Sequence, residues 1–193
     1  ITVPNVTSSS SNVTIVMGSG TWSLFQAGVV WTMTAGNVTP ETSTIDIVDT
    51  SSTGKIFSGG GKTYNILTVT GDNVTIQGNN TFTTINVNNA ALTNGLKLTS
   101  GSTQIVTNFT TNGSVDNLAK LVSTSAGSAA ILRGTTKTIS VDYVSIKDST
   151  ITGAPQWYAG TNSTNVSGNT RWIFDAPPSP RAGSSNHQNP GVV

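Results

Sequence analysis

Short segments in which apolar and small polar residues alternate recur along the chain from about residue 43. An apolar–polar–apolar triplet places two side chains on the same face of a strand. Gly, Asn, Ser and Asp separate these segments, as is typical of turns. The pattern therefore predicts many short strands joined by turns. The segments are Ile45–Ile47, Ile66–Val69, Val74–Ile76, Ile85–Val87, Leu96–Leu98, Ile105–Val106, Leu118–Leu121, Ile131–Leu132, Ile139–Val141 and Val144–Ile146.

The spacing of the apolar residues indicates a repeating coil. A period of about 20 residues is typical of a solenoid, in which each turn buries its apolar side chains on the turn before. We therefore predict an all-β fold, a right-handed parallel β-helix or β-solenoid of about five coils, with a β-sandwich as the alternative. One series, with steps of 19, 20, 26 and 20 residues, is Ile66, Ile85, Ile105, Ile131 and Ile151; the other, with steps of 22, 23 and 20, is Ile76, Leu98, Leu121 and Val141.

The segments outside this pattern differ in composition. Aromatic residues gather in both flanks, and because a solenoid end exposes apolar core, we expect them to form end caps. Four of the seven prolines lie in the last 19 residues, which therefore read as a tail or linker. The predicted division is an N-terminal strand region and cap over 1–42, the solenoid over 43–153, a C-terminal aromatic cap over 154–174 and a Pro-rich tail over 175–193.

The composition supports the strand prediction and excludes several classes of protein. Thr, Ser, Asn and Gly make up 96 of the 193 residues, and all four rank low in helix propensity. Only 9% of residues are charged and the formal net charge is +1, so no basic surface for nucleic acid is predicted. The chain has no Cys and no apolar stretch of the roughly 20 residues that span a bilayer.

Several stretches of the chain have the form of recurrent motifs. They are Phe57–Asn65 followed by Leu67–Val69, Gly78–Phe82 followed by Ile85–Val87, Val141–Ser149, Trp157–Ser163 and Asn169–Phe174. Together these stretches resemble a family of parallel β-helix-like proteins found among tailed-phage and environmental viral sequences. The resemblance covers about residues 20–174. Many family members end the unit with Gly-Trp, whereas Arg171 precedes Trp172 here.

This resemblance implies a non-enzymatic structural protein on a phage virion surface: a fibre, a spike or a capsid decoration. Phage surface proteins are commonly symmetric oligomers, so the expected partners are further copies of the chain, with a trimer as one form, and other virion proteins. The expected location is the virion surface, with a secreted or cell-surface protein as the alternative. The alternative function is a bacterial adhesin or a carbohydrate-binding β-solenoid module.

No catalytic, cofactor or metal site is predicted. Asp142 and Asp148 are the best local carboxylate pair, but six extended residues span about 20 Å, whereas glycosidase carboxylates lie roughly 5–9.5 Å apart. These acids are better interpreted as turn residues that accept hydrogen bonds from backbone N–H groups. Asp46 and Asp49 are the acids to consider for a Ca²⁺ site, because solenoid turns can present oxygen ligands, but they too are better interpreted as turn residues. The single His187 lies in the tail, which argues against a transition-metal site or a catalytic triad.

A surface glycan is the one small ligand that the sequence suggests. Trp157 and Tyr158 are adjacent aromatic residues, and an aromatic face can stack on a sugar ring. The competing interpretation is that both side chains close the end of the core, because aromatic residues bury the largest area per residue. Trp157 and Tyr158 are therefore the candidate contacts for a glycan or a protein partner.

Overall fold

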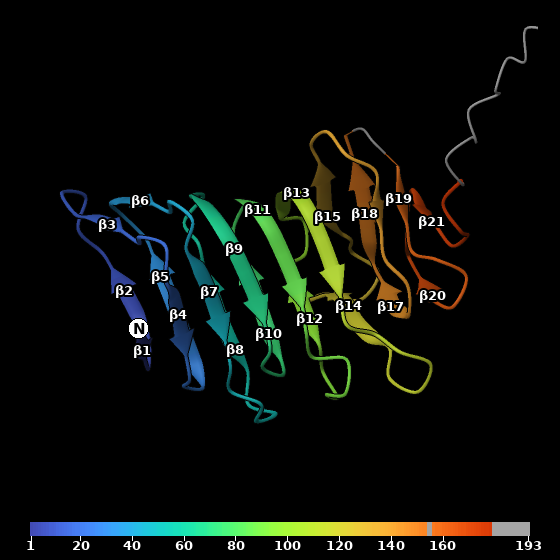
Figure 1. The fold of residues 1–193 in the computed structure, drawn as a ribbon, viewed down its shortest axis with the longest axis horizontal. Helices are drawn as coiled ribbons and strands as arrows, with labels where there is room; N and C mark the ends of the chain where they lie inside the picture. The colour runs from blue at the N-terminus through green and yellow to red at the C-terminus, as the bar shows by residue number, and fades with distance from the viewer. Residues whose placement is uncertain (154–155, 179–193) are drawn as a thin grey trace, which may run out of the picture.

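The computed structural model describes residues 1–153 and 156–178, and these residues form a parallel β-solenoid of about seven turns. Strands stack one behind another along the long axis of the molecule, from the N-terminal turns to the C-terminal ones (Figure 1). Every pairing between the named strands is parallel. The β-solenoid prediction is confirmed, and the β-sandwich alternative, which requires antiparallel sheets, is wrong.

Two sheets of eight strands each, together with two shorter ones, contain all the strands. The first sheet contains β1 (Thr2–Val3), β4 (Thr21–Leu24), β7 (Thr44–Ile47), β9 (Thr63–Val69), β11 (Asn80–Val87), β13 (Thr103–Thr111), β15 (Ala130–Gly134) and β18 (Ser149–Thr152). The second contains β2 (Val6–Ser8), β5 (Gly28–Met33), β8 (Lys55–Ser58), β10 (Val74–Gln77), β12 (Leu96–Leu98), β14 (Ala119–Ser123), β17 (Val144–Lys147) and β20 (Thr164–Ser167). The shorter sheets are β16 (Ile139–Ser140) with β19 (Trp157–Tyr158) and β21 (Trp172–Ile173), and β3 (Thr14–Val16) with β6 (Asn37–Thr39).

The long strands β9, β11 and β13 each cover two sides of the solenoid. β7 pairs with the second half of β9, whereas β15 pairs with the first half of β13. The two halves of these long strands are therefore continuous in the middle turns and correspond to separate strands nearer the ends. Each turn consequently has three sides, and the second sheet forms the third of them.

Alternate side chains of each strand point into the core and stack on their counterparts in the next turn. Leu24 pairs with Ile47, Ile47 with Val69, and Val69 with Val87, and all four side chains are buried. Such a column forms because side chains alternate between the two faces of a strand and the pairing keeps equal positions in line. Apolar burial of this kind is the main stabilising contribution in a chain without disulfides.

Two aromatic clusters lie inside the solenoid. The first, near the N-terminus, joins five side chains: Trp22, Trp31, Phe57, Tyr64 and Phe82. Phe57 stacks on Trp31 at 5.8 Å and meets Tyr64 edge-on at 5.1 Å between ring centroids. The indole of Trp31 donates a hydrogen bond to the Tyr64 hydroxyl at 3.0 Å, and this hydroxyl donates to the Gly59 carbonyl. The second cluster, in the last turns, consists of Phe109, Trp157 and Trp172.

The spacing of stacked positions is less regular than the sequence suggests. Paired residues are 15 positions apart between Trp157 and Trp172 and 28 apart between Thr103 and Ile131. The predicted series that joins Ile66 to Ile85 is wrong, because Ile66 pairs with Thr84 and points outward. A shift of one residue moves a side chain to the opposite face, so apolar spacing alone does not fix the register.

The second predicted series is partly correct. Ile76 pairs with Leu98 as expected. Leu121, however, pairs with Leu96 on one side and with Ile146 on the other, not with Leu98 and Val141. The turn loops differ in length, and these differences displace the apolar positions by a few residues from one turn to the next.

The flanking segments also form turns. The strands of residues 1–42 pair within the same sheets as the strands that follow, and β19 to β21 continue the stack after residue 155. For this reason the turns number about seven, against the five expected. Residues 179–193, which form most of the predicted Pro-rich tail and include His187, lie outside the described residues. The part of the chain that the structure describes contains no helix long and apolar enough to cross a membrane.

Replacement of Phe57 by Ala tests the first aromatic cluster. The Phe57 side chain is fully buried, and its removal leaves a cavity between Trp31, Tyr64 and Phe82, so the free energy of unfolding should fall by about 3–5 kcal/mol. Denaturant unfolding followed by Trp fluorescence measures this change. The matched control is Phe25→Ala, because the Phe25 side chain is 49% exposed. Equal effects of the two substitutions would contradict the assignment.

Candidate functional site

Several of the polar contacts between turns lie on one edge of the solenoid, where the chain enters the strands of the second sheet. We call this edge the turn row. It includes Asp49, Asp72, Asp116 and Asp142, four of the eight acidic residues of the chain. Because the turns are stacked, side chains that lie about 20 residues apart in the sequence meet here. The turn row consists of residues 48–54, 70–73, 88–95, 112–118, 141–143 and 159–163.

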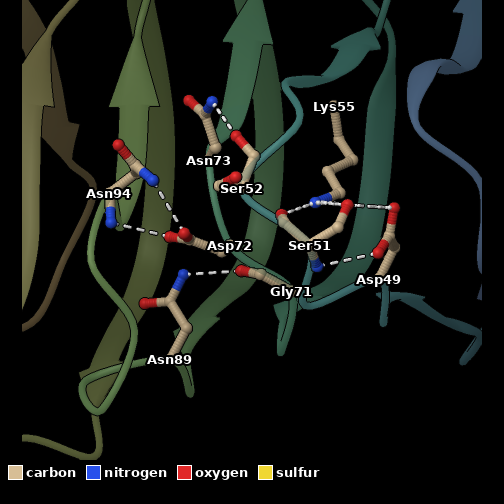
Figure 2. A network of polar contacts seen from close by, with 9 residues as sticks. All are labelled: Asp49, Ser51, Ser52, Lys55, Gly71, Asp72, Asn73, Asn89 and Asn94. Atoms are coloured by element: carbon tan, nitrogen blue, oxygen red, sulfur yellow. Dashed lines mark hydrogen bonds and ion pairs between the residues drawn. The ribbon is translucent and has the colours of Figure 1, made fainter.

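Asp72 fastens one turn to the next. Its carboxylate accepts hydrogen bonds from the backbone N–H of Asn94 at 2.7 Å and from the Asn94 side-chain amide at 2.7 Å (Figure 2). It also accepts one from the N–H of Gly95 at 3.1 Å. The Asp72 residue is almost fully buried. A buried carboxylate needs several donors to be stable as an anion, and the loop 88–95 supplies three of them.

Asp142 makes the same arrangement farther along the solenoid. It accepts from the backbone N–H of Asn162 at 3.0 Å and from the Asn162 amide at 2.7 Å, and also from the N–H of Tyr143. The residue after each aspartate has a positive φ, 54° at Asn73 and 53° at Tyr143, which turns the chain sharply into the next strand. We name these two units, Asp72 with Asn94 and Asp142 with Asn162, the Asp–Asn clasps.

Further side-chain amides connect the turns around the first clasp. Asn73 donates to the Ser52 carbonyl of the preceding turn at 2.7 Å, and Asn89 donates to the Gly71 carbonyl at 2.7 Å (Figure 2). These carbonyl groups lie in turns, where they have no partner in the strand ladders, and the side-chain amides supply the missing hydrogen bonds. Three consecutive turns are therefore joined by side chains as well as by backbone pairing.

Lys55 is a fully buried cation at the start of β8. Its ammonium lies 3.5 Å from a carboxylate oxygen of Asp49 and donates to the carbonyl and the hydroxyl of Ser51 (Figure 2). Three partners match the three protons of the ammonium group. A buried ion pair of this kind holds the loop 48–54 in one conformation, and removal of either partner leaves an uncompensated charge.

The hydrogen bonds lower the pKa of three of these carboxyl groups. At Asp49 the main cause is the backbone N–H of Ser51, and the charge of Lys55 adds to it. At Asp72 and Asp142 burial raises the pKa, but the hydrogen-bond donors together outweigh it and the net shift is downward. The donors are Asn94, Gly95 and Asn73 at Asp72, and Asn162, Tyr143 and Ser163 at Asp142. These carboxylates are thus held as anions in structural roles.

Asp46 behaves in the opposite way. It lies on β7, and burial raises the pKa of its carboxyl group, an effect that a hydrogen bond from the Thr70 hydroxyl at 2.8 Å only partly offsets. The Asp49 carboxylate forms an ion pair with Lys55 and accepts a hydrogen bond from the backbone N–H of Ser51. The two acids considered for Ca²⁺ are therefore engaged with different partners, and within residues 1–153 and 156–178 no three His, Cys, Asp or Glu side chains form a metal-binding group.

The structure does not place the carboxylates of Asp142 and Asp148 next to each other. The two residues lie at opposite ends of β17, and Asp148 accepts a hydrogen bond from the N–H of Gly127 on another edge of the solenoid. Both acids accept hydrogen bonds from backbone N–H groups at turns. The interpretation of these carboxylates as turn residues is confirmed.

Trp157 and Tyr158 lie in the last turns. The Trp157 side chain is fully buried, and Tyr158 is 6% exposed, with its hydroxyl donating to the Gln156 side chain at 2.7 Å. A ring that stacks on a sugar needs an open face, which neither ring has. The structure therefore places these residues as expected for the closure of the core, with Trp157 against Phe109 and Trp172.

A hollow of about 350 Å³ opens on the turn row between the loops 88–95 and 112–118. Its lining combines apolar side chains, an acid and a base, and it includes Ala91, Leu92, Asp116, Leu118 and Lys120. No pattern in the sequence predicts this hollow. The two loops are separated by β12 and β13, and only the stacking of turns brings them side by side.

The chain matches no protein-family model, no curated protein and no solved structure.

Asp72→Ala tests the first clasp. The substitution leaves the N–H groups of Asn94 and Gly95 without their acceptor, which should lower the free energy of unfolding by about 1–3 kcal/mol. Chemical denaturation measures the loss. Asp116→Ala is the matched control on the same edge, since Asp116 is exposed and accepts no hydrogen bond from the described residues. A clasp without structural importance would give the same small change in both variants.

The stability of the fold should decrease at acid pH. A carboxyl group whose pKa is lowered on folding stabilises the folded state above its unfolded pKa of about 3.9, and this contribution is lost as the pH falls through the folded value. Asp49, Asp72 and Asp142 act in this direction, while the raised pKa of Asp46 acts in the opposite one. The midpoint of urea unfolding, measured from pH 7 to pH 2, should therefore fall below about pH 4.

The double variant Asp72→Asn/Asp142→Asn distinguishes the contribution of the clasps to the pH dependence of stability from that of the other acids. Because asparagine does not titrate, the variant should be less stable at pH 7 and should show a shallower decline on acidification than the unmodified protein. An unchanged slope would mean that the clasps do not carry the pH dependence.

Proposed function

We propose that the chain is a non-enzymatic structural protein that holds a rigid rod-like shape on the surface of a phage virion, as a fibre, a spike or a capsid decoration. The observation that carries this proposal is the double fastening of each turn in the middle of the solenoid. Backbone ladders join the strands, and the clasps and amide bonds of the turn row join the connections between them.

Such fastening suits a mechanical role. In a solenoid each turn contacts only its neighbours, so local opening of a turn is the weakest point. Asp72 and Asn89 bind the loops that would otherwise open first, and the ion pair of Lys55 with Asp49 fixes a third loop. A rod built in this way keeps its shape without disulfides.

The charged groups support a structural role over a catalytic one. Catalytic carboxyl groups commonly have a pKa that burial or a like charge raises toward the working pH. At Asp49, Asp72 and Asp142 the pKa is lowered, and each carboxylate is saturated by donors from the protein itself. These groups have little capacity left for a substrate.

The virion setting depends on the sequence resemblance to phage β-helix proteins. A bacterial adhesin or a secreted surface module with the same rod would use the fold equally well. Contacts with further copies or with other surface proteins would form most readily where a strand edge is open. Among residues 1–153 and 156–178, β1, β2 and β3 each pair with one strand only.

Fractionation of the source culture tests the proposed location. Particles purified on a density gradient should contain peptides of this chain in a constant ratio to the other particle proteins, measured by quantitative mass spectrometry. A cytosolic enzyme of the same culture is the control for contamination. Recovery of the chain only with the cell envelope would favour the adhesin alternative, and recovery only with the cytosolic control would contradict both.

A further inference from the structure

The hollow on the turn row has the chemistry of a binding site, and it is independent of where the protein resides. We propose that it binds one residue of a neutral sugar, with Asp116 and Lys120 as the polar contacts and leucine side chains as the apolar wall. Its volume of about 350 Å³ is at the lower end of the range for small-molecule sites, which suits a single sugar ring.

Asp116 differs from the other acids of the turn row. Asp49, Asp72 and Asp142 each accept hydrogen bonds from neighbouring residues, whereas the exposed carboxylate of Asp116 accepts none from the part of the chain that the structure describes. Both oxygens of Asp116 are thus available. A free carboxylate can accept hydrogen bonds from two adjacent hydroxyl groups, an arrangement that sugars offer.

Lys120 also lines the hollow, and backbone carbonyl groups hold its side chain in place. Its ammonium donates to the carbonyl of Thr93 at 2.6 Å and lies 3.5 Å from that of Leu92. Gly95 permits this placement, because it has a positive φ of 67° and a Cβ there would come within 2.5 Å of the Lys120 Cβ. Two of the three ammonium protons are therefore engaged, and the third remains for a ligand oxygen.

The charge and the apolar wall restrict the class of ligand. The lining contains one acid and one base, Asp116 and Lys120, so its formal charge is zero and a neutral ligand is favoured over a charged one. Leu92 and Leu118 are partly exposed and can contact the C–H face of a ring, while the hydroxyl groups at its edge meet the polar side chains. A polyhydroxylated ring satisfies both requirements.

Ligand-observed NMR tests this site directly. Saturation-transfer spectra are recorded for the intact protein with the methyl glycosides of glucose, galactose, mannose and N-acetylglucosamine, and with the charged sugars glucosamine and N-acetylneuraminic acid. At least one neutral glycoside should receive saturation and give a dissociation constant in titration. Absence of transfer to all four neutral glycosides, or tighter binding of a charged sugar than of every neutral one, overturns the proposal.

Two variants locate the binding. Asp116→Asn keeps the shape of the side chain but removes the charge, and Leu118→Ser removes part of the apolar wall; each should weaken binding of the responding glycoside about tenfold, which is about 1.4 kcal/mol. Glu41→Gln is the matched control, because it removes an exposed acid at a distance from the hollow. Circular dichroism and unfolding verify that all variants are folded. Unchanged binding in both Asp116→Asn and Leu118→Ser places the ligand elsewhere and overturns the proposal.

The sugar-binding experiment and the fractionation of particles can give negative results independently of each other. A protein recovered from virions that binds no neutral sugar remains a structural rod without this site. A protein that binds sugar through Asp116 but is recovered with the cell envelope is an adhesive module and not a virion component.

Discussion

The stacking of parallel strands in register is the constraint on which the rest of this structure depends. Once a turn pairs with its neighbour, each inward side chain must fit on its counterpart, as Leu24, Ile47, Val69 and Val87 do. The backbone groups of the strands are then satisfied by the ladders. The backbone groups of the turns are not, and a buried turn without partners would be costly. The polar side chains of the turn row meet this requirement.

The few charges of the chain are placed accordingly. Asp72 and Asp142 supply acceptors to the N–H groups of the following loop, and Lys55 supplies donors to the carbonyl and hydroxyl of its own loop. In each case a charged group compensates for several backbone or side-chain groups at once, since charge-assisted hydrogen bonds are the stronger ones. This explains how a chain with 9% charged residues can still bury a lysine and two aspartates, Lys55, Asp72 and Asp148.

The same constraint also determines where the surface can vary. The strands must keep their register, but the turns can change in length without loss of pairing, and the offset between paired residues indeed varies along the stack. The hollow forms where two long loops, 88–95 and 112–118, follow each other. A rigid rod with variable turns can thus present a distinct binding surface while its core remains regular, which connects the proposed structural role with the proposed sugar site.

The alternation of apolar and polar residues and the abundance of Thr, Ser, Asn and Gly determined that the fold is all-β with many short strands, because these residues favour strands and turns over helices. A spacing of about 20 residues favoured a solenoid over a β-sandwich, and the parallel pairing of the strands decided between them. The sequence predicts turn roles for Asp142 and Asp148, and both accept hydrogen bonds from backbone N–H groups at turns. Only the tertiary structure decided the register, as Ile66 shows by pairing with Thr84. It also decided the clasps, the burial of Lys55 and the hollow at Asp116 and Lys120, since these contacts depend on loop lengths that apolar spacing does not reveal. For Trp157 and Tyr158 the sequence left both a glycan contact and closure of the core open. Both side chains are buried, and Trp157 packs against Phe109 and Trp172, which lie in other turns.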